Sequence, residues 1–241
     1  MSVKATAGNA AGKPGFNFDF TAIARRPEFG ALIGAIAVYI FFSVAGGSGF
    51  SDAGGWASWL NVASEVGIIA LPVALVMIAG DLDLSVGSTL AASSMTMAIL
   101  SGFFGLPTWI GVLAALLFGA AVGWLNGYIV TKTNLPAFVV TLATMFIIMG
   151  VTLGTTRLIV GSTSVSMKAD PFFQTIFGNL IFGLFETAVV WWAIVALIVS
   201  WILYKSVYGN WIYAIGGDAV SARATGIPVN KVRIALFMGS G

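Results

Sequence analysis

Two carboxylates and two hydroxyls interrupt long apolar runs within the segment Gly80–Ser88, GDLDLSVGS. They are Asp81, Asp83, Ser85 and Ser88. These side chains can cap the helix that follows, because carboxylates and hydroxyls accept hydrogen bonds from the free N–H groups of a first helical turn. Alternatively, the break lies deeper in a membrane and lines a cavity, where two acids could bind a cation or a polar ligand. The residues leave both interpretations open.

A further carboxylate, Glu65, lies inside the apolar run 60–79. A charge at such a position is costly unless it is paired or faces water. Glu65 is therefore expected either to reach the outer membrane interface or to line a polar path.

The composition excludes most catalytic chemistry. The 241 residues include no Cys and no His, which removes disulfides, cysteine-based metal sites, redox couples, the usual general base and the commonest zinc ligand. We expect no enzyme activity, no cofactor and no metal; an intramembrane enzyme using Asp81 and Asp83 as an acid pair is a weak alternative.

The charge and the motifs exclude two further functions. A net charge of +2 does not provide the clustered basic surface that a nucleic-acid-binding protein needs. No phosphate-binding loop ending in Lys-Ser or Lys-Thr is present, so energy from ATP must enter through a partner.

The elements that position these residues are membrane helices. The chain is 59% apolar and 8% charged, whereas soluble domains are roughly 25% charged. A bilayer core needs about 20 apolar residues per helix. We predict an all-α polytopic bundle, in a domain over 29–241, that follows a polar tail over 1–28. Six full spans are expected, and a seventh begins near Ile234; the six are 29–45, 60–79, 84–104, 108–131, 135–156 and 184–204.

The distribution of basic residues predicts the direction of the spans. With the N-terminus in the cytoplasm, nine Lys and Arg residues fall inside and two fall outside, which is the bias that membrane insertion favours. The inside set is Lys4, Lys13, Arg25, Arg26, Lys132, Lys205, Arg223, Lys231 and Arg233, and the outside set is Arg157 and Lys168.

Small residues recur at every fourth position of the run 108–131. Such a ridge allows a neighbouring helix backbone to approach closely. Packing within one subunit is the favoured interpretation, and a dimer interface is the alternative. The ridge comprises Gly111, Ala115, Gly119, Gly123 and Gly127.

A short helix is expected in the cytoplasmic loop 205–233. Asp218 is a good N-cap, Ala219–Thr225 has helical character, Gly226 suits a left-handed stop and Pro228 prevents continuation. This loop is either a solvated connector or the docking point of a soluble partner.

Three segments resemble signatures of the sugar-type ABC importer permeases, the ribose/xylose/galactose family. Gly80–Ser88 resembles that family's G-x-x-DLSVGS motif. The segment Asn134–Met145, NLPAFVVTLATM, resembles its LPPFIVTLGTM segment, and Tyr213–Gly226, YAIGGDAVSARATG, resembles its YAIGGNxxAAxLSG loop. The three matches occur in the family's order, from about residue 60 to the C-terminus.

The resemblance implies a multi-pass permease of the bacterial inner membrane that passes a monosaccharide inward. Implied partners are a cytoplasmic ABC ATPase, a periplasmic sugar-binding protein, a second permease copy in a homodimer or heterodimer, and membrane lipid. The resemblance also bears on the substrate pathway, for which the candidates are Asn61, Glu65, Asp81, Asp83, Ser85, Ser88 and Thr141. It assigns ATPase coupling to the loop residues Gly216, Gly217, Asp218, Ala222, Arg223 and Gly226.

This sequence departs from the family pattern at several positions. Asp81 replaces an uncharged residue, Asp218 replaces Asn, and Ala137 replaces Pro. Family members usually continue through several more spans, so the chain is expected to be C-terminally truncated relative to them. The alternative function is therefore an accessory subunit, derived from a permease and packed in another membrane complex.

Overall fold

The computed structural model describes residues 27–133 and 135–241, and the chain divides into two units, Met1–Gly55 and Trp56–Gly241. The described part is almost entirely helical, as predicted. In chain order its elements are α2 (Pro27–Gly46), α3 (Ser48–Ser51), α4 (Ala53–Ile78), α5 (Val86–Met97), η1 (Ala98–Phe103), α6 (Thr108–Lys132), α7 (Ala137–Val160), α8 (Pro171–Phe177), β1 (Leu180–Ile181), β2 (Phe185–Glu186), α9 (Thr187–Lys205), α10 (Val207–Gly217), α11 (Ala219–Ala224) and α12 (Val229–Ser240).

Six helical segments of the described chain are long and apolar enough to cross a membrane, which confirms the predicted spans. The boundaries differ most at α4, which begins seven residues before the predicted start at 60, because the Asp52 carboxylate accepts a hydrogen bond from the Gly55 N–H at 2.7 Å and supports its first turn. The helix expected near Ile234 begins earlier, at Val229. The predicted tail lies outside the described residues, apart from the first two residues of α2.

The first unit contains α2 and α3. The ring of Phe50 lies 5.7 Å from the Tyr39 ring and 6.0 Å from the Phe42 ring, measured between centroids. These contacts hold the short helix α3 to the end of α2.

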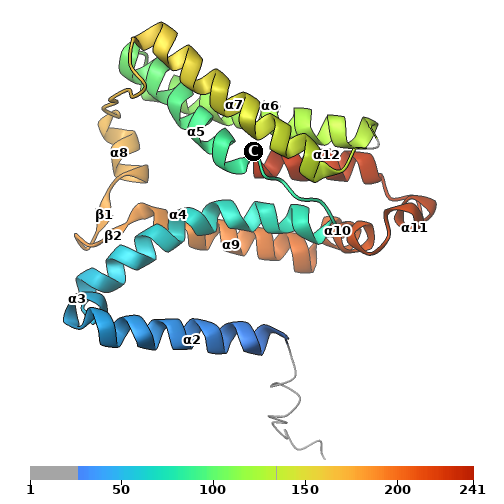
Figure 1. Cartoon of the computed structure of the whole chain (residues 1–241), viewed down its shortest axis with the longest axis horizontal. Coiled ribbons are helices and arrows are strands. Elements are labelled where there is room, and N and C mark those ends of the chain that lie inside the picture. Colours follow the sequence, from blue (N-terminus) through green and yellow to red (C-terminus); the bar gives the residue numbers. More distant parts are fainter. Residues whose placement is uncertain (1–26, 134) are drawn as a thin grey trace, which may run out of the picture. The chain divides into compact units, whose positions relative to one another are not determined.

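In the second unit, α5, α6 and α7 pack together and α12 lies along α6 (Figure 1). The small-residue ridge makes this approach possible. A Cβ atom added at Gly123 would lie 2.0 Å from the carbonyl oxygen of Phe237, and one at Gly127 would lie 2.8 Å from the Cα of Ile234. Gly119 meets Gly241 in the same way, so the two helices run antiparallel.

The first part of the ridge serves other neighbours. Gly111 is buried against Met97 and Ser101, at the junction of α5 and η1, and Ala115 faces a cavity between helices. The structure therefore places all five ridge residues on contacts or cavities within this chain.

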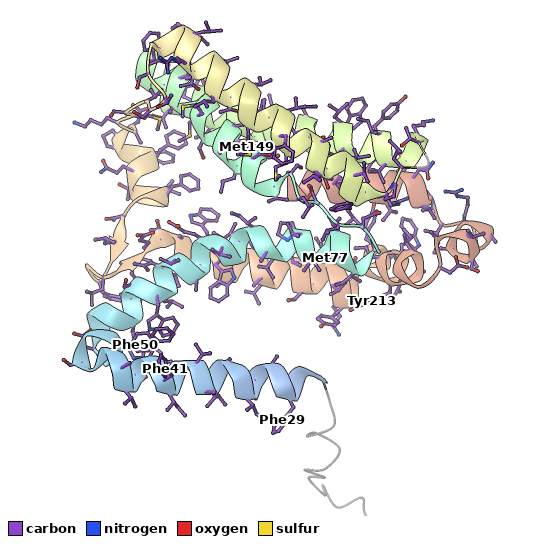
Figure 2. All side chains as sticks on the ribbon, in the orientation of Figure 1. Phe29, Phe41, Phe50, Met77, Met149 and Tyr213 are labelled. Carbon is purple, nitrogen blue, oxygen red and sulfur yellow. The ribbon has the colours of Figure 1, made fainter. Side chains whose placement is uncertain are left out.

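The outward faces of the spanning helices are apolar. No residue of α9 is buried, and Phe146, Ile147 and Leu158 on α7 are exposed by more than half of their surface. Figure 2 shows such side chains projecting outward along these helices. A helix that is apolar around its circumference belongs in lipid or against other membrane helices.

The ends of α6 and α9 carry Lys132 and Lys205 in their last turns, and α10 and α11 lie at this same end of the unit (Figure 1). We refer to it as the basic end. At the opposite end, the Asp170 carboxylate accepts a hydrogen bond from the Thr108 N–H at 3.0 Å, and the Asp170 N–H donates to the Thr108 hydroxyl at 2.9 Å. This reciprocal pair ties the segment that leads to α8 to the start of α6.

Candidate functional site

The predicted break between the second and third spans is a non-helical segment, residues 79–85, that enters the bundle. Ser85 receives a hydrogen bond from the Asn126 side chain at 2.8 Å, and Asn126 lies six residues before Lys132 at the basic end of α6. At 1.5 Å rise per residue, this depth is about 9 Å along α6. The segment 79–85 therefore ends, at Ser85, well inside the bundle.

A buried hydrogen-bonded chain links this segment to three helices. Asp83 Oδ1 accepts from the Ser85 N–H at 2.9 Å and from the Ser85 hydroxyl at 2.7 Å. Asp83 Oδ2 accepts from the Ser240 hydroxyl on α12 at 2.7 Å. On the far side, the Thr144 hydroxyl of α7 lies 2.6 Å from Asn126 Oδ1, to which it donates. A carboxylate that is buried in this way is stabilised by the donors around it, since an unpaired one would be costly.

Other hydroxyls satisfy the backbone of the same segment. The Thr141 hydroxyl accepts from the Leu84 N–H at 3.2 Å and donates to the Ala137 carbonyl at 2.9 Å. Ser88 and Thr89 donate their hydroxyls to the Ser85 carbonyl, at 2.7 and 3.0 Å. The expectation that these side chains cap the next helix is wrong: Ser85 is the N-cap residue of α5 and its side chain makes no cap hydrogen bond, while Asp83 accepts from Ser85 itself. Binding of a cation or a polar ligand by the two acids stays a prediction.

Asp81 has a different partner from Asp83. Its carboxylate forms a two-point contact with the Arg233 guanidinium of α12: Arg233 Nε donates to Asp81 Oδ2 at 2.6 Å, and Arg233 Nη2 donates to Oδ1. The Asp81 side chain is only 7% exposed and that of Arg233 is 23% exposed. Asp81, Asp83, Ser85, Ser88 and Thr141 therefore lie together, in contacts that hold the segment in place.

A cavity of about 610 Å³ lies beside this network, between α4, α5, α6 and the end of α12. Ser240, which binds Asp83, is part of its lining, as are Ile69 and Pro72 of α4. Ser93 also lines it, and the Ser93 hydroxyl is buried with no hydrogen-bond partner among the described residues. Such a volume is typical of small-molecule sites.

Glu65 belongs to the same face of α4 as the residues that line this cavity. It precedes Ile69 by four residues and Pro72 by seven, so the three lie in one row along the helix. Glu65 is exposed and lies near the middle of α4, about 18 Å from the helix start at Ala53. The two expectations for Glu65, that it reaches the outer membrane interface or lines a polar path, stay predictions.

Asn61 lies one turn before Glu65 and is used differently. Its side chain donates to the Leu184 carbonyl at 3.1 Å and accepts from the Glu186 N–H at 2.9 Å. These bonds attach α4 to the hairpin of β1 and β2, in which Ile181 pairs with Phe185.

The coupling-loop candidates form a compact turn of helices at the basic end. α10 ends with Gly216 and Gly217; a Cβ atom at Gly216 would lie 1.9 Å from the Ile78 carbonyl, so only glycine fits against the end of α4. Gly217 has open space around its Cα. Tyr213 on α10 is half exposed and points outward (Figure 2).

Asp218 caps α11 as predicted. Its carboxylate accepts from the N–H groups of Val220 at 3.0 Å and Ser221 at 3.1 Å, and from the Ser221 hydroxyl. The Ser221 hydroxyl, followed by these two N–H groups, lowers the pKa of Asp218 below its ordinary value of 3.8. Because the folded-state pKa is depressed, the cap contributes fully above pH 3.8 and is lost only as the pH falls further.

The remaining loop residues connect α11 to α12. Ala222 is buried, and the Arg223 guanidinium donates to Asn230 Oδ1 at 3.0 Å. Gly226 has a φ of +89°, the left-handed conformation expected of a helix stop. The predicted short helix with a cap at each end is therefore present.

Four residues of the site were not predicted: Asn126, Thr144 and Ser240 in the buried network, and Arg233 as the partner of Asp81. Asn126 carried a signal, because an amide inside an apolar span needs a polar partner. Ser240 and Thr144 carried none, since hydroxyls are common in membrane helices. Within the described ranges, no group of three or more acidic, His or Cys side chains comes together that could hold a metal.

Comparisons with known proteins agree with this architecture. Residues 55–241 match the family described as "Branched-chain amino acid transport system / permease component". The chain is 32% identical over 183 residues to the "Ribose import permease protein RbsC" of Haemophilus influenzae, covering 76% of this chain and 55% of that protein. It is 32% identical over 179 residues to the "L-arabinose transport system permease protein AraH" of Escherichia coli K12, covering 74% and 52%.

A third relative is the "Inner membrane ABC transporter permease protein YjfF" of Escherichia coli K12, 32% identical over 183 residues. The chain spans about half the length of these curated relatives. No solved structure matches it. The six candidate membrane spans, the buried signature segment and the family match over residues 55–241 together show that this chain belongs to the permease-component family of ABC transport systems.

Proposed function

We propose that this chain is the membrane-spanning subunit of an ATP-driven importer of a monosaccharide in the bacterial inner membrane. A cytoplasmic ABC ATPase would supply the energy, and a periplasmic binding protein would deliver the sugar. The names of the relatives RbsC and AraH refer to ribose and L-arabinose, which supports a sugar as the substrate. A second permease copy, in a homodimer or heterodimer, would complete the pathway.

The observation that carries this proposal is the connection from α11 to the buried network. α11 is a six-residue helix capped by Asp218 and stopped by Gly226, and α12, which follows it, ends where Ser240 binds Asp83. A soluble ATPase that engages α11 would therefore act on a helix that reaches the interior of the bundle.

The cavity beside this network is our candidate for part of the sugar pathway. Sugar hydroxyls need hydrogen-bond partners. Ser93 in the cavity lining would provide one, and Glu65 lies one helical turn before the lining residue Ile69. Among the residues first considered for the pathway, Glu65 therefore has the strongest case. Asp81, Asp83, Ser85, Ser88 and Thr141 are better suited to holding the segment 79–85, and Asn61 to anchoring the hairpin.

The first experiment is purification of the native complex in mild detergent, followed by intact-mass measurement and reconstitution into proteoliposomes. We expect an ABC ATPase and a sugar-binding protein to co-purify, and uptake of labelled ribose, arabinose or xylose to require ATP. Labelled leucine is the control substrate, because the family description names branched-chain amino acids. A 25.0 kDa chain held in an unrelated membrane complex without an ATPase would establish the accessory-subunit alternative.

A variant of the coupling turn refines the test. Gly226→Val forces a β-branched residue into a φ of +89°, so we expect uptake to fall while the protein remains in the membrane. Gly150→Ala is the matched control, because the space around Gly150 is open. Equal uptake by both variants would count against a coupling role for this turn.

A further inference from the structure

We propose that the Asp81–Arg233 pair positions the segment 79–85 in response to movement of α11, so that it transmits the state of the ATPase to the interior of the bundle. The inference rests on the proposed function, and it assigns a role to the acid by which this sequence departs from its family pattern.

The contact between Asp81 and Arg233 is strong and directional. Arg233 Nε lies 2.6 Å from Asp81 Oδ2, and Nη2 binds the other carboxylate oxygen. A two-point contact of this kind fixes the relative orientation of its partners as well as their distance. With the Asp81 side chain 7% exposed, solvent screens the attraction only weakly.

α12 holds the segment 79–85 at two places. Ser240 follows Arg233 by seven residues, which is two helical turns, so both side chains lie on one face of α12. Arg233 binds Asp81, and Ser240 binds Asp83 at 2.7 Å. Because two separated contacts join the segment to one helix face, the segment must follow both translation and tilt of α12.

α11 and α12 are joined tightly. The Ile227 N–H donates to the Ala222 carbonyl at 3.2 Å, and Arg223 binds Asn230 across the turn. Ala222, Val229 and Val232 share one buried cluster. A displacement of α11 therefore reaches α12 without an intervening flexible linker.

A structural brace is the competing explanation, and the two make different predictions. Removing one partner leaves a buried charge without compensation and destabilises the fold, whereas removing both charges relieves that penalty. The double variant D81N/R233Q should therefore restore stability under either explanation. Only a transmitting pair predicts that nucleotide-dependent movement stays lost in the stable double variant.

The test is hydrogen exchange of the permease bound to its ATPase, with ADP and with a non-hydrolysable ATP analogue. In the unmodified protein and in the control Lys231→Gln, which changes an exposed residue of α12 near Arg233, we expect the analogue to alter exchange both in α11 and over 79–85. In D81N/R233Q we expect the change in α11 to persist and the change over 79–85 to be lost. Uptake per ATP hydrolysed should fall roughly tenfold, a common magnitude of coupling between sites.

Three results would overturn the inference. In the first, the double variant keeps the nucleotide-dependent change over 79–85. In the second, the double variant imports sugar with an unchanged yield per ATP. In the third, the unmodified protein shows a change in α11 and none over 79–85. Absence of any nucleotide effect on α11 in the unmodified protein is a separate outcome, which refutes the proposed ATPase docking and the transmission together.

Discussion

At the scale of single residues, the buried polar network depends on each hydroxyl serving two partners. The Ser85 hydroxyl donates to Asp83 at 2.7 Å and accepts from Asn126 at 2.8 Å, in a position that is 1% exposed. Both neighbours are buried as well, Asp83 at 5% and Asn126 at 0% exposure. Loss of any one member therefore leaves a buried polar group without its partner.

Ser85→Ala should lower the thermal stability of the purified protein in detergent. The substitution leaves the Asn126 amide donor unsatisfied and removes one donor to Asp83, a loss of about 1–3 kcal/mol in unfolding free energy. Ser94→Ala, at an exposed position of α5, is the control and should shift the melting temperature little. If both variants melt at the same temperature, the hydroxyl does not support the network.

At the scale of elements, the glycine ridge decides which helices meet. α12 contains apolar and polar residues on all sides and could approach several neighbours, yet it lies along α6. The reason is steric. The backbone of α12 packs directly against Gly119, Gly123 and Gly127 of α6, and a side chain at any of these three positions would push the two helices apart.

Gly123→Val should detach α12 from α6. The added Cβ would lie 2.0 Å from the Phe237 carbonyl oxygen, and a carbonyl in a helix cannot move alone. We expect faster proteolysis at 225–228 and a lower melting temperature. Gly154→Ala on α7, where no atom would meet the new Cβ, should behave like the unmodified protein. Equal protease resistance of the two variants would contradict the packing role of Gly123.

At the scale of the whole molecule, the distribution of charge predicts which end of the bundle faces the cytoplasm. Lys132, Lys205 and Arg223 lie at the basic end, while Arg157 lies in the last turn of α7 at the opposite end. Positively charged ends remain on the cytoplasmic side during insertion. We therefore predict that α10 and α11 are cytoplasmic and that the segment 161–186 is external.

Cysteine labelling checks this orientation directly, because the chain contains no Cys and any introduced one is a single reporter. Ser164→Cys should react with a membrane-impermeant maleimide applied to spheroplasts. Val220→Cys, which is 78% exposed on α11, should react only after the membrane is opened. The reverse pattern would invert the proposed topology and remove α11 from the reach of a cytoplasmic ATPase.

Much of the architecture could be predicted because it depends on local patterns. Apolar runs of membrane length located the six spans, and Asp218, Gly226 and Pro228 bounded the short helix, since each acts on its own neighbours in the chain. The four-residue spacing of small residues likewise predicted close helix packing before any partner was known.

The partners of the buried acids could not be predicted, because they come from residues distant in the sequence. Arg233 lies 152 positions after Asp81, and Ser240 lies 157 after Asp83. An acid in GDLDLSVGS has the same local preferences whether it caps a helix, lines a path or binds α12. Only the tertiary structure, by bringing α12 along the glycine ridge of α6, decided that both acids meet α12 and that Ser85 lies inside the bundle.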